Sequence, residues 1–233
     1  MALSYDQAIK NVLAEIHSDP TLYPTEINVK AVKKINKFLD TYLAHVIKEI
    51  DTTGKYVTDK DIENAVYNIG KQNELTNLAV RSGQKAVIAS EPASPSDIEE
   101  RIIELLEPHY IVDEPMRKSV KKLTLMKKTK GNHGLHFSSS TVAQKMRKAM
   151  KNPKSKATIP TIKNEASIYL AAILEYLTAE LLELSGSQLY DGPKEINDRH
   201  VYNSIERDDE LKELCISIGF KYSAGIPKGK LLN

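Results

Sequence analysis

The feature that most constrains the fold is a pattern of helices that occurs twice along the chain. In each half, one long run of apolar residues at helical spacing is flanked by shorter helical runs. The long helices are expected at about 29–50 and 165–186. The shorter ones are expected at 4–17, 58–69, 74–88, 139–150, 198–205 and 208–215. A long helix with one apolar stripe must bury that stripe against another element. We therefore expect an all-α protein in which the two long helices cross, forming a pseudo-dimer from one chain.

Local signals set several helix ends. Ser4 is expected to cap the first helix, and Asp198 the helix at 198–205. Thr58, with Asp61 three residues later, approximates a capping box in which aspartate replaces the usual glutamate. Between the two halves, Ser94 precedes a proline and opens a short helix. The rest of this connector is expected to be a partly ordered tether, acidic first and basic later.

Composition argues against several classes of protein. The 233 residues include 41% hydrophobic residues, no tryptophan and one cysteine, so no intramolecular disulfide can form. Cys215 lies in an apolar pattern and is expected to be a buried structural thiol. No signal peptide, membrane span or phosphate-binding glycine loop is evident. His133 and His136 lie close together, but the single distant cysteine completes no zinc set. We expect neither an enzyme, a cofactor nor a metal site.

Charge is strongly segregated although the formal net charge is only +2. Two stretches, 117–130 and 145–163, hold seven basic residues each and no acid. They are Arg117, Lys118, Lys121, Lys122, Lys127, Lys128 and Lys130, and then Lys145, Arg147, Lys148, Lys151, Lys154, Lys156 and Lys163. Such separation favours a polyanion-binding face with an acidic face elsewhere. A solvated lysine-rich surface is the alternative.

Several motifs carry a resemblance to known families. The segment YLAAILEYLTAELLELSG (169–186) resembles the long central helix of histone 2A, with GLHF (134–137) before it and RDDELKEL (207–214) after it. This resemblance covers about residues 127–228. In the first half, SYDQAIKNVLAEIH (4–17), DIENAV (61–66) and ELTNLAVRSGQKAV (74–87) resemble histone 2B. Two such families in this order resemble the fused histone doublets of large DNA viruses of the marseillevirus type.

The resemblance implies a domain plan and a function. Residues 1–90 would form a histone 2B-like fold, 91–133 a connector and 134–233 a histone 2A-like fold with a C-terminal docking segment. Such a doublet would wrap double-stranded DNA largely independently of sequence, together with a histone 3/histone 4-like pair that could itself be fused. It would compact a viral genome in the host nucleus or viral replication compartment, and in the virion.

The resemblance also implies three sets of functional residues. The DNA-binding set is Lys30, Lys55, Tyr56, Thr58, Arg147, Lys148, Lys151, Lys154, Lys156, Lys163, Lys194 and Arg199. The acidic patch, which would bind basic peptides or neighbouring nucleosomes, is Glu74, Glu175, Glu180, Glu183, Asp208, Asp209 and Glu210. Docking on the partner histones would use Ile226 and Pro227. The loop at 54–58 would sit beside the basic loop at 151–163.

The chain also departs from the families. Thr141, Gly54 and Glu195 stand at positions where the histone families insert an arginine into the minor groove of DNA. Ser82 stands where histone 2B contributes an acid to the acidic patch. These departures predict looser DNA wrapping. Two other classes stay open: a histone-fold transcription or replication subunit that holds DNA or protein without wrapping, and a membrane-surface or RNA-binding basic protein.

Overall fold

The computed structural model describes residues 3–16, 24–50, 54–71, 73–110, 113–118, 120, 134–151, 159–189 and 195–222. In the first half the elements are α1 (Asp6–Ile16), β1 (Glu26–Ile27), α2 (Val29–Glu49), β2 (Tyr56–Val57), α3 (Asp59–Gly70) and α4 (Glu74–Ser90). Helix α5 (Pro95–Leu106) follows in the connector. The second half has α7 (Ser139–Met150), β3 (Thr161–Ile162), α8 (Asn164–Gly186), the 3₁₀ turn η1 (Ser187–Leu189), β4 (Glu195–Ile196), α9 (Asp198–Arg207) and α10 (Asp209–Ser217). This part of the chain is mostly helical, as expected, and the long helices lie where the periodicity predicted them.

The helix caps agree with the sequence in part. The Thr58 hydroxyl accepts a hydrogen bond from the Asp61 backbone N–H (3.3 Å), and Asp61 accepts one from the Thr58 N–H (2.8 Å). The capping box is therefore confirmed.

Two predicted caps were misplaced. Helix α1 begins at Asp6, whose N–H donates to Ser4 Oγ (3.2 Å). The residue that flanks the helix is therefore Tyr5, and the predicted cap at Ser4 is one residue too early. Asp198 is the first residue of α9, and the cap is Asn197, whose N–H donates to His200 Nδ1 (3.2 Å). A histidine takes the place of the expected glutamate in this second capping box, so the sequence rule missed it.

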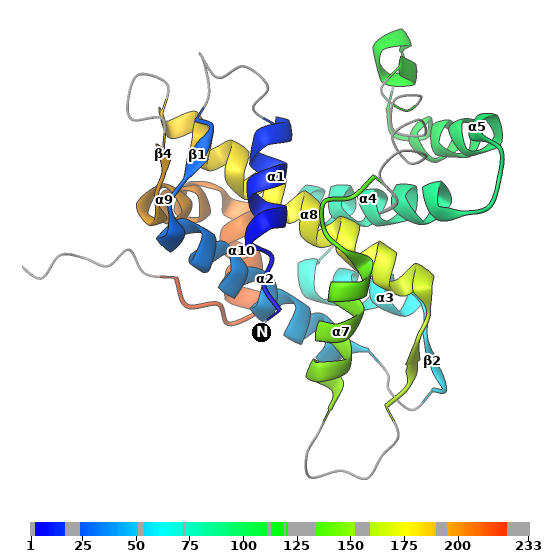
Figure 1. Cartoon of the computed structure of the whole chain (residues 1–233), viewed down its shortest axis with the longest axis horizontal. Helices are drawn as coiled ribbons and strands as arrows, with labels where there is room; N and C mark the ends of the chain where they lie inside the picture. The colour runs from blue at the N-terminus through cyan, green and yellow to red at the C-terminus, as the bar shows by residue number, and fades with distance from the viewer. Residues whose placement is uncertain are drawn as a thin grey trace, which may run out of the picture.

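The two long helices run in opposite directions between the same two ends of the molecule (Figure 1). Strand β1, which precedes α2, pairs in parallel with β4, which follows α8. Strand β2, which follows α2, pairs in parallel with β3, which precedes α8. In Figure 1 these strand pairs lie at opposite ends. Each long helix also packs on short helices of the other half: α2 on α7 and α9, and α8 on α1 and α3.

Helix α8 is the centre of the core. Its residues are buried on almost every side, and its most extensive neighbour is α4 of the first half. At the α4–α8 contact, Gly83 lies against the ring of Tyr169. The Tyr169 hydroxyl donates to Glu63 of α3 (3.0 Å). One continuous core therefore joins the two halves.

Helix α5 and Cys215 both lie where the sequence predicted them. Helix α5 packs on α4 through Ile98, Ile102 and Leu106. Cys215 is fully buried, and burial raises the pKa of its thiol to about 12, as a structural thiol requires. Across the described ranges, no group of three histidine, cysteine or acidic side chains could hold a metal ion. None of the helices there is long and apolar enough to cross a bilayer.

Candidate nucleic-acid interface

The β2–β3 pair joins the loop after α2 to the loop before α8. The Thr161 N–H donates to the carbonyl of Lys55 (3.0 Å), and the Lys163 N–H donates to the carbonyl of Val57 (2.9 Å). Tyr56 lies opposite Thr161 in this register. The prediction that these two loops are neighbours is thus confirmed. The backbone ladder brings lysines from the two halves to the same place.

Tyr56 organises the charge at this loop pair. Its ring centroid lies 4.3 Å from the Lys163 ammonium and 5.3 Å from the Lys55 ammonium. Both contacts are cation–π interactions, which offset the repulsion between two like charges. Tyr56 remains 42% exposed, and both lysines are exposed, so the two ammonium groups face solvent at one point.

The start of helix α8 adds backbone donors to this loop pair. Lys163 occupies the N-cap position, and among the described residues the first turn has no side-chain cap. Free N–H groups and the helix dipole make such an end suitable for an anion. The neighbouring start of α3 differs, because Thr58 and Asp61 already cap it. The Thr58 hydroxyl donates to the Asp61 carboxylate (2.8 Å), so this side chain already has an intramolecular acceptor.

The β1–β4 pair at the other end has the opposite character. Glu26 and Glu195 lie directly across from each other in the parallel register, and both are exposed. Lys30 and Arg199 are exposed in the first turns of α2 and α9. The Glu26 partner of Glu195 was missed by sequence reasoning, because a parallel register between distant segments leaves no local signal. Two carboxylates side by side repel phosphate.

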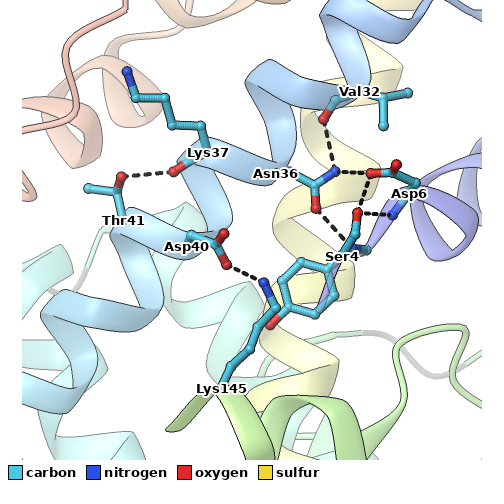
Figure 2. Close-up of polar contacts among 9 residues, drawn as sticks. Ser4, Asp6, Val32, Asn36, Lys37, Asp40, Thr41 and Lys145 are labelled. Atoms are coloured by element: carbon cyan, nitrogen blue, oxygen red, sulfur yellow. Dashed lines mark hydrogen bonds and ion pairs between the residues drawn. The ribbon is translucent and has the colours of Figure 1, made fainter. Parts of the chain in front are cut away.

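The basic stretch on α7 divides into two kinds of residue. Arg147, Lys148 and Lys151 are exposed. The Lys145 side chain is only 10% exposed, because its ammonium donates to Asp40 of α2 (2.6 Å) and lies 4.3 Å from the Tyr5 ring centroid. Figure 2 shows Lys145 reaching toward Asp40. Lys145 thus holds the halves together and is not available as a free surface cation.

A second network beside Lys145 fixes the start of α1 on α2 (Figure 2). The Asn36 amide accepts a hydrogen bond from the Tyr5 N–H (2.9 Å) and donates to the Asp6 carboxylate (2.6 Å) and the Val32 carbonyl (3.1 Å). The Tyr5 ring itself packs against that of Phe137, which precedes α7, with the two planes tilted by 37°. The first residues of α1 are therefore held against both halves.

The predicted acidic patch is partly assembled. Burial raises the pKa of Glu180, and the nearby charges of Glu183, Asp208 and Glu210 raise it further. These four side chains therefore lie close enough to share one negative field, which we call the acidic surface. Asp209 and Glu74 are exposed beside it on α10 and α4. The Glu210 carboxylate also caps α4 by accepting hydrogen bonds from the N–H groups of Glu74 (3.1 Å) and Leu75 (2.6 Å).

Glu175 has a different environment from the rest of the predicted patch. Its carboxylate accepts hydrogen bonds from the N–H groups of His136 (2.6 Å) and Phe137 (2.9 Å). Burial raises its pKa. Glu175 thus anchors the segment before α7, and helical spacing alone could not distinguish this role from a surface position.

Comparisons with known proteins point to one kind of relative. No family model matches the chain. A stretch of 63 residues, 27% of the chain, is 41% identical to a histone 2A of Pisum sativum and 40% identical to one of Plasmodium falciparum, covering 42% and 48% of those proteins. A macro-type histone 2A of Capsaspora owczarzaki is 41% identical over 17% of its length. This segment is histone-like. The chain spans less than half the length of the curated relatives it matches.

Some predicted positions have no described structure. Lys154, Lys156, Lys194, Ile226 and Pro227 lie outside the described residues. Gly54 is exposed at the β2–β3 end, and Thr141 is half-buried in the first turn of α7.

A pair of Tyr56 variants tests whether the ring positions the two lysines. Tyr56→Phe keeps the ring and should leave DNA affinity within about twofold of the wild type, whereas Tyr56→Leu should weaken binding by roughly fivefold, the equivalent of about 1 kcal/mol of cation–π interaction. The salt slope should not change, because no charge is removed. Fluorescence anisotropy with a DNA duplex measures both quantities. Equal affinities for the two variants would show that the ring has no positioning role.

Proposed function

We propose that the chain consists of two tandem histone folds that bind double-stranded DNA largely independently of sequence. The first fold would span 1–90 and resemble histone 2B, the second would span 134–233 and resemble histone 2A, and 91–133 would connect them. The observation that carries this proposal is the β2–β3 pairing. It gathers Lys55, Tyr56 and Lys163 at the uncapped start of α8.

This arrangement suits phosphate rather than bases. Ammonium groups and backbone N–H groups bind phosphate oxygens and carry no direct sequence information. Exposed Arg147, Lys148 and Lys151 on α7 extend the cationic surface. Lysine also supplies a point charge, without the planar fork of arginine. The expected binding is therefore sensitive to salt and insensitive to base sequence.

The wider biology is proposed from the resemblance to viral doublets. The chain would combine with a histone 3/histone 4-like pair, using Ile226 and Pro227, to form nucleosome-like particles. These would compact a viral genome in the host nucleus or viral replication compartment, and in the virion. The acidic surface would bind basic peptides or a neighbouring particle, since four carboxylates share one field there.

One observation favours a second candidate. Glu26 and Glu195 occupy the loop pair opposite β2–β3, where a wrapping protein needs cations. A histone-fold subunit of a transcription or replication complex would hold DNA at one end without bending it around both. This alternative predicts binding to short duplexes without protection of a long fragment.

The first experiment compares two double variants with equal loss of charge. Lys55→Ala/Lys163→Ala should lower affinity similarly on unrelated duplex sequences and reduce the salt slope by about 0.9 for each phosphate that the protein no longer neutralises. The control, Lys10→Ala/Lys37→Ala, removes two exposed cations from the middle of α1 and the middle of α2. Anisotropy titrations at salt concentrations from about 50 to about 300 mM measure the slopes. An equal slope change in the control would refute the β2–β3 site, and weaker binding confined to one DNA sequence would point to base reading.

A further inference from the structure

Two cavities lie end to end along helix α4. One, of about 340 Å³, lies between α1, α4 and α8, and the other, of about 380 Å³, lies between α4, α5 and the side chains of Tyr110, Met116 and Val120. Ser82, Lys85 and Tyr176 line both. The cavities therefore form a single groove along α4 with these three side chains at its middle. Their volumes suit a few side chains of a bound peptide.

Lys85 is a cation in this groove on which no carboxylate of the described residues acts closely. Within the described ranges, no hydrogen bond or ion pair engages its ammonium group. Burial and the nearby charge of Arg81 lower its pKa, and no carboxylate opposes them. Arg81, one turn earlier, is already engaged, since it donates to the Tyr110 hydroxyl (2.9 Å) and lies 5.2 Å from that ring. A half-buried ammonium in this position gains most from a carboxylate supplied from outside.

The walls on either side of Lys85 are largely apolar. The first cavity is lined by Val12, Ile16, Ala86, Ala89, Leu135, Ala172 and Ala179. The second is lined by Leu78, Ile102, Leu106, Met116 and Val120. Glu175 and Glu15 also border the first cavity, but the Glu175 carboxylate is held by two backbone N–H groups and the Glu15 carboxylate by the ring of His136. Apolar side chains are thus the occupants that these walls fit.

The groove is continuous with the acidic surface. Tyr176 lines both cavities, and its hydroxyl donates to the Glu180 carboxylate (3.3 Å). Glu183 adds to the negative charge at Glu180. Along this face, the carboxylates, the apolar walls and the positive charges of Arg81 and Lys85 therefore follow one another. A purely basic peptide would satisfy the carboxylates but would be repelled at Lys85.

We propose that this groove binds a partner-protein segment that carries an apolar side chain together with an aspartate or glutamate for Lys85. The same segment would place a basic side chain against Glu180 and Glu183. The basic contact rests on the proposed function of the acidic surface, whereas the acidic and apolar contacts are new. Ser82, which stands where the family has an acid, adds a hydroxyl beside Lys85 in place of a repulsive charge.

A charge-reversal selection tests this proposal with the full-length chain. A random dodecapeptide display library is selected on the wild type, on Lys85→Glu and on the control Lys48→Glu, which reverses an exposed lysine of α2. The wild type and the control should enrich peptides that combine basic, apolar and acidic residues. Lys85→Glu should enrich peptides in which the acidic residue has become basic. Thermal melting verifies that each variant is folded.

The affinity of one selected synthetic peptide then measures how much the contact with Lys85 contributes to binding. Exchanging its acidic residue for lysine should weaken binding to the wild type at least tenfold and strengthen binding to Lys85→Glu. If both proteins respond equally, Lys85 does not select the partner and the inference is wrong. Glu180→Gln/Glu183→Gln tests the basic contact separately from the contact at Lys85. Peptides selected on this variant should lose the enrichment of basic residues even if Lys85 has no role. Selection of no peptide, as expected if another part of the chain or a second copy covers the groove, would overturn both.

Discussion

Replacing Gly83 with leucine is expected to lower the free energy of unfolding by about 3 kcal/mol, the upper end of what overpacking usually costs. A Cβ atom at position 83 would lie 2.8 Å from Cε1 of Tyr169. The ring cannot easily move away, because it is buried and its hydroxyl is bonded to Glu63. Since α4 and α8 belong to different halves, the strain falls on the contact that joins them. Chemical denaturation monitored by circular dichroism measures the change.

Two further variants identify the cause of this effect. Ser82→Leu introduces the same side chain one residue earlier, where two cavities offer space, and should change stability by less than about 0.5 kcal/mol. Gly83→Ala tests whether even a single added methyl group lowers the free energy of unfolding. Helix propensity alone predicts that alanine raises it by about 1 kcal/mol. We expect destabilisation instead. A stabilised Gly83→Ala protein would show that the α4–α8 contact is looser than described.

The second large effect concerns the β1–β4 pair. Glu26→Gln/Glu195→Arg should raise DNA affinity roughly tenfold at about 0.1 M salt and increase the salt slope by about 0.9, the value of one additional neutralised phosphate. Both carboxylates lie at the end of the molecule opposite Lys55 and Lys163 (Figure 1). Removing their charge and adding a guanidinium converts a repulsive end into an attractive one. Salt titrations by anisotropy measure the increase.

A control variant with the same change of charge tests whether the position of the substitution matters. Glu107→Gln/Glu104→Arg makes the same change of charge on exposed positions at the end of α5, away from both strand pairs. This control should raise affinity by less than about twofold, through net charge alone. An equal increase in both variants would mean that general electrostatic attraction, and not the β1–β4 end, sets the affinity. Unchanged affinity in Glu26→Gln/Glu195→Arg would mean that DNA does not reach this end.

The helical framework could be predicted because its signals are local. Apolar residues recur every three to four positions along α2 and α8, and Thr58 with Asp61 marks the start of α3 within one turn. The neighbourhood of the two loops followed from the resemblance and from the need of each long helix to bury its stripe. The helix predictions depend only on residues that lie near each other in the chain.

The electrostatic details could not be predicted, because they depend on register between distant segments. Glu26 faces Glu195 across 169 positions of sequence, and Lys145 meets Asp40 across 105. Nothing in the basic stretch at 145–163 distinguishes Lys145, whose side chain is largely covered, from exposed Arg147 and Lys148. Glu175 likewise shares the helical pattern of Glu180, yet its carboxylate turns to backbone N–H groups. Counting charges along the chain therefore overestimated both the free cations and the free carboxylates.

Nuclease protection of a reconstituted particle tests the central claim most directly. The full chain is mixed with a histone 3/histone 4 pair and duplex DNA, and the complex is digested and sized. The account predicts a discrete protected fragment of nucleosome scale, about 146 base pairs or somewhat less if the ends are loose, that appears only when both proteins are present. Omitting either protein should leave shorter, heterogeneous fragments. A digest with no discrete fragment, or full protection by this chain alone, would contradict the proposal that it supplies one histone pair of a nucleosome-like particle.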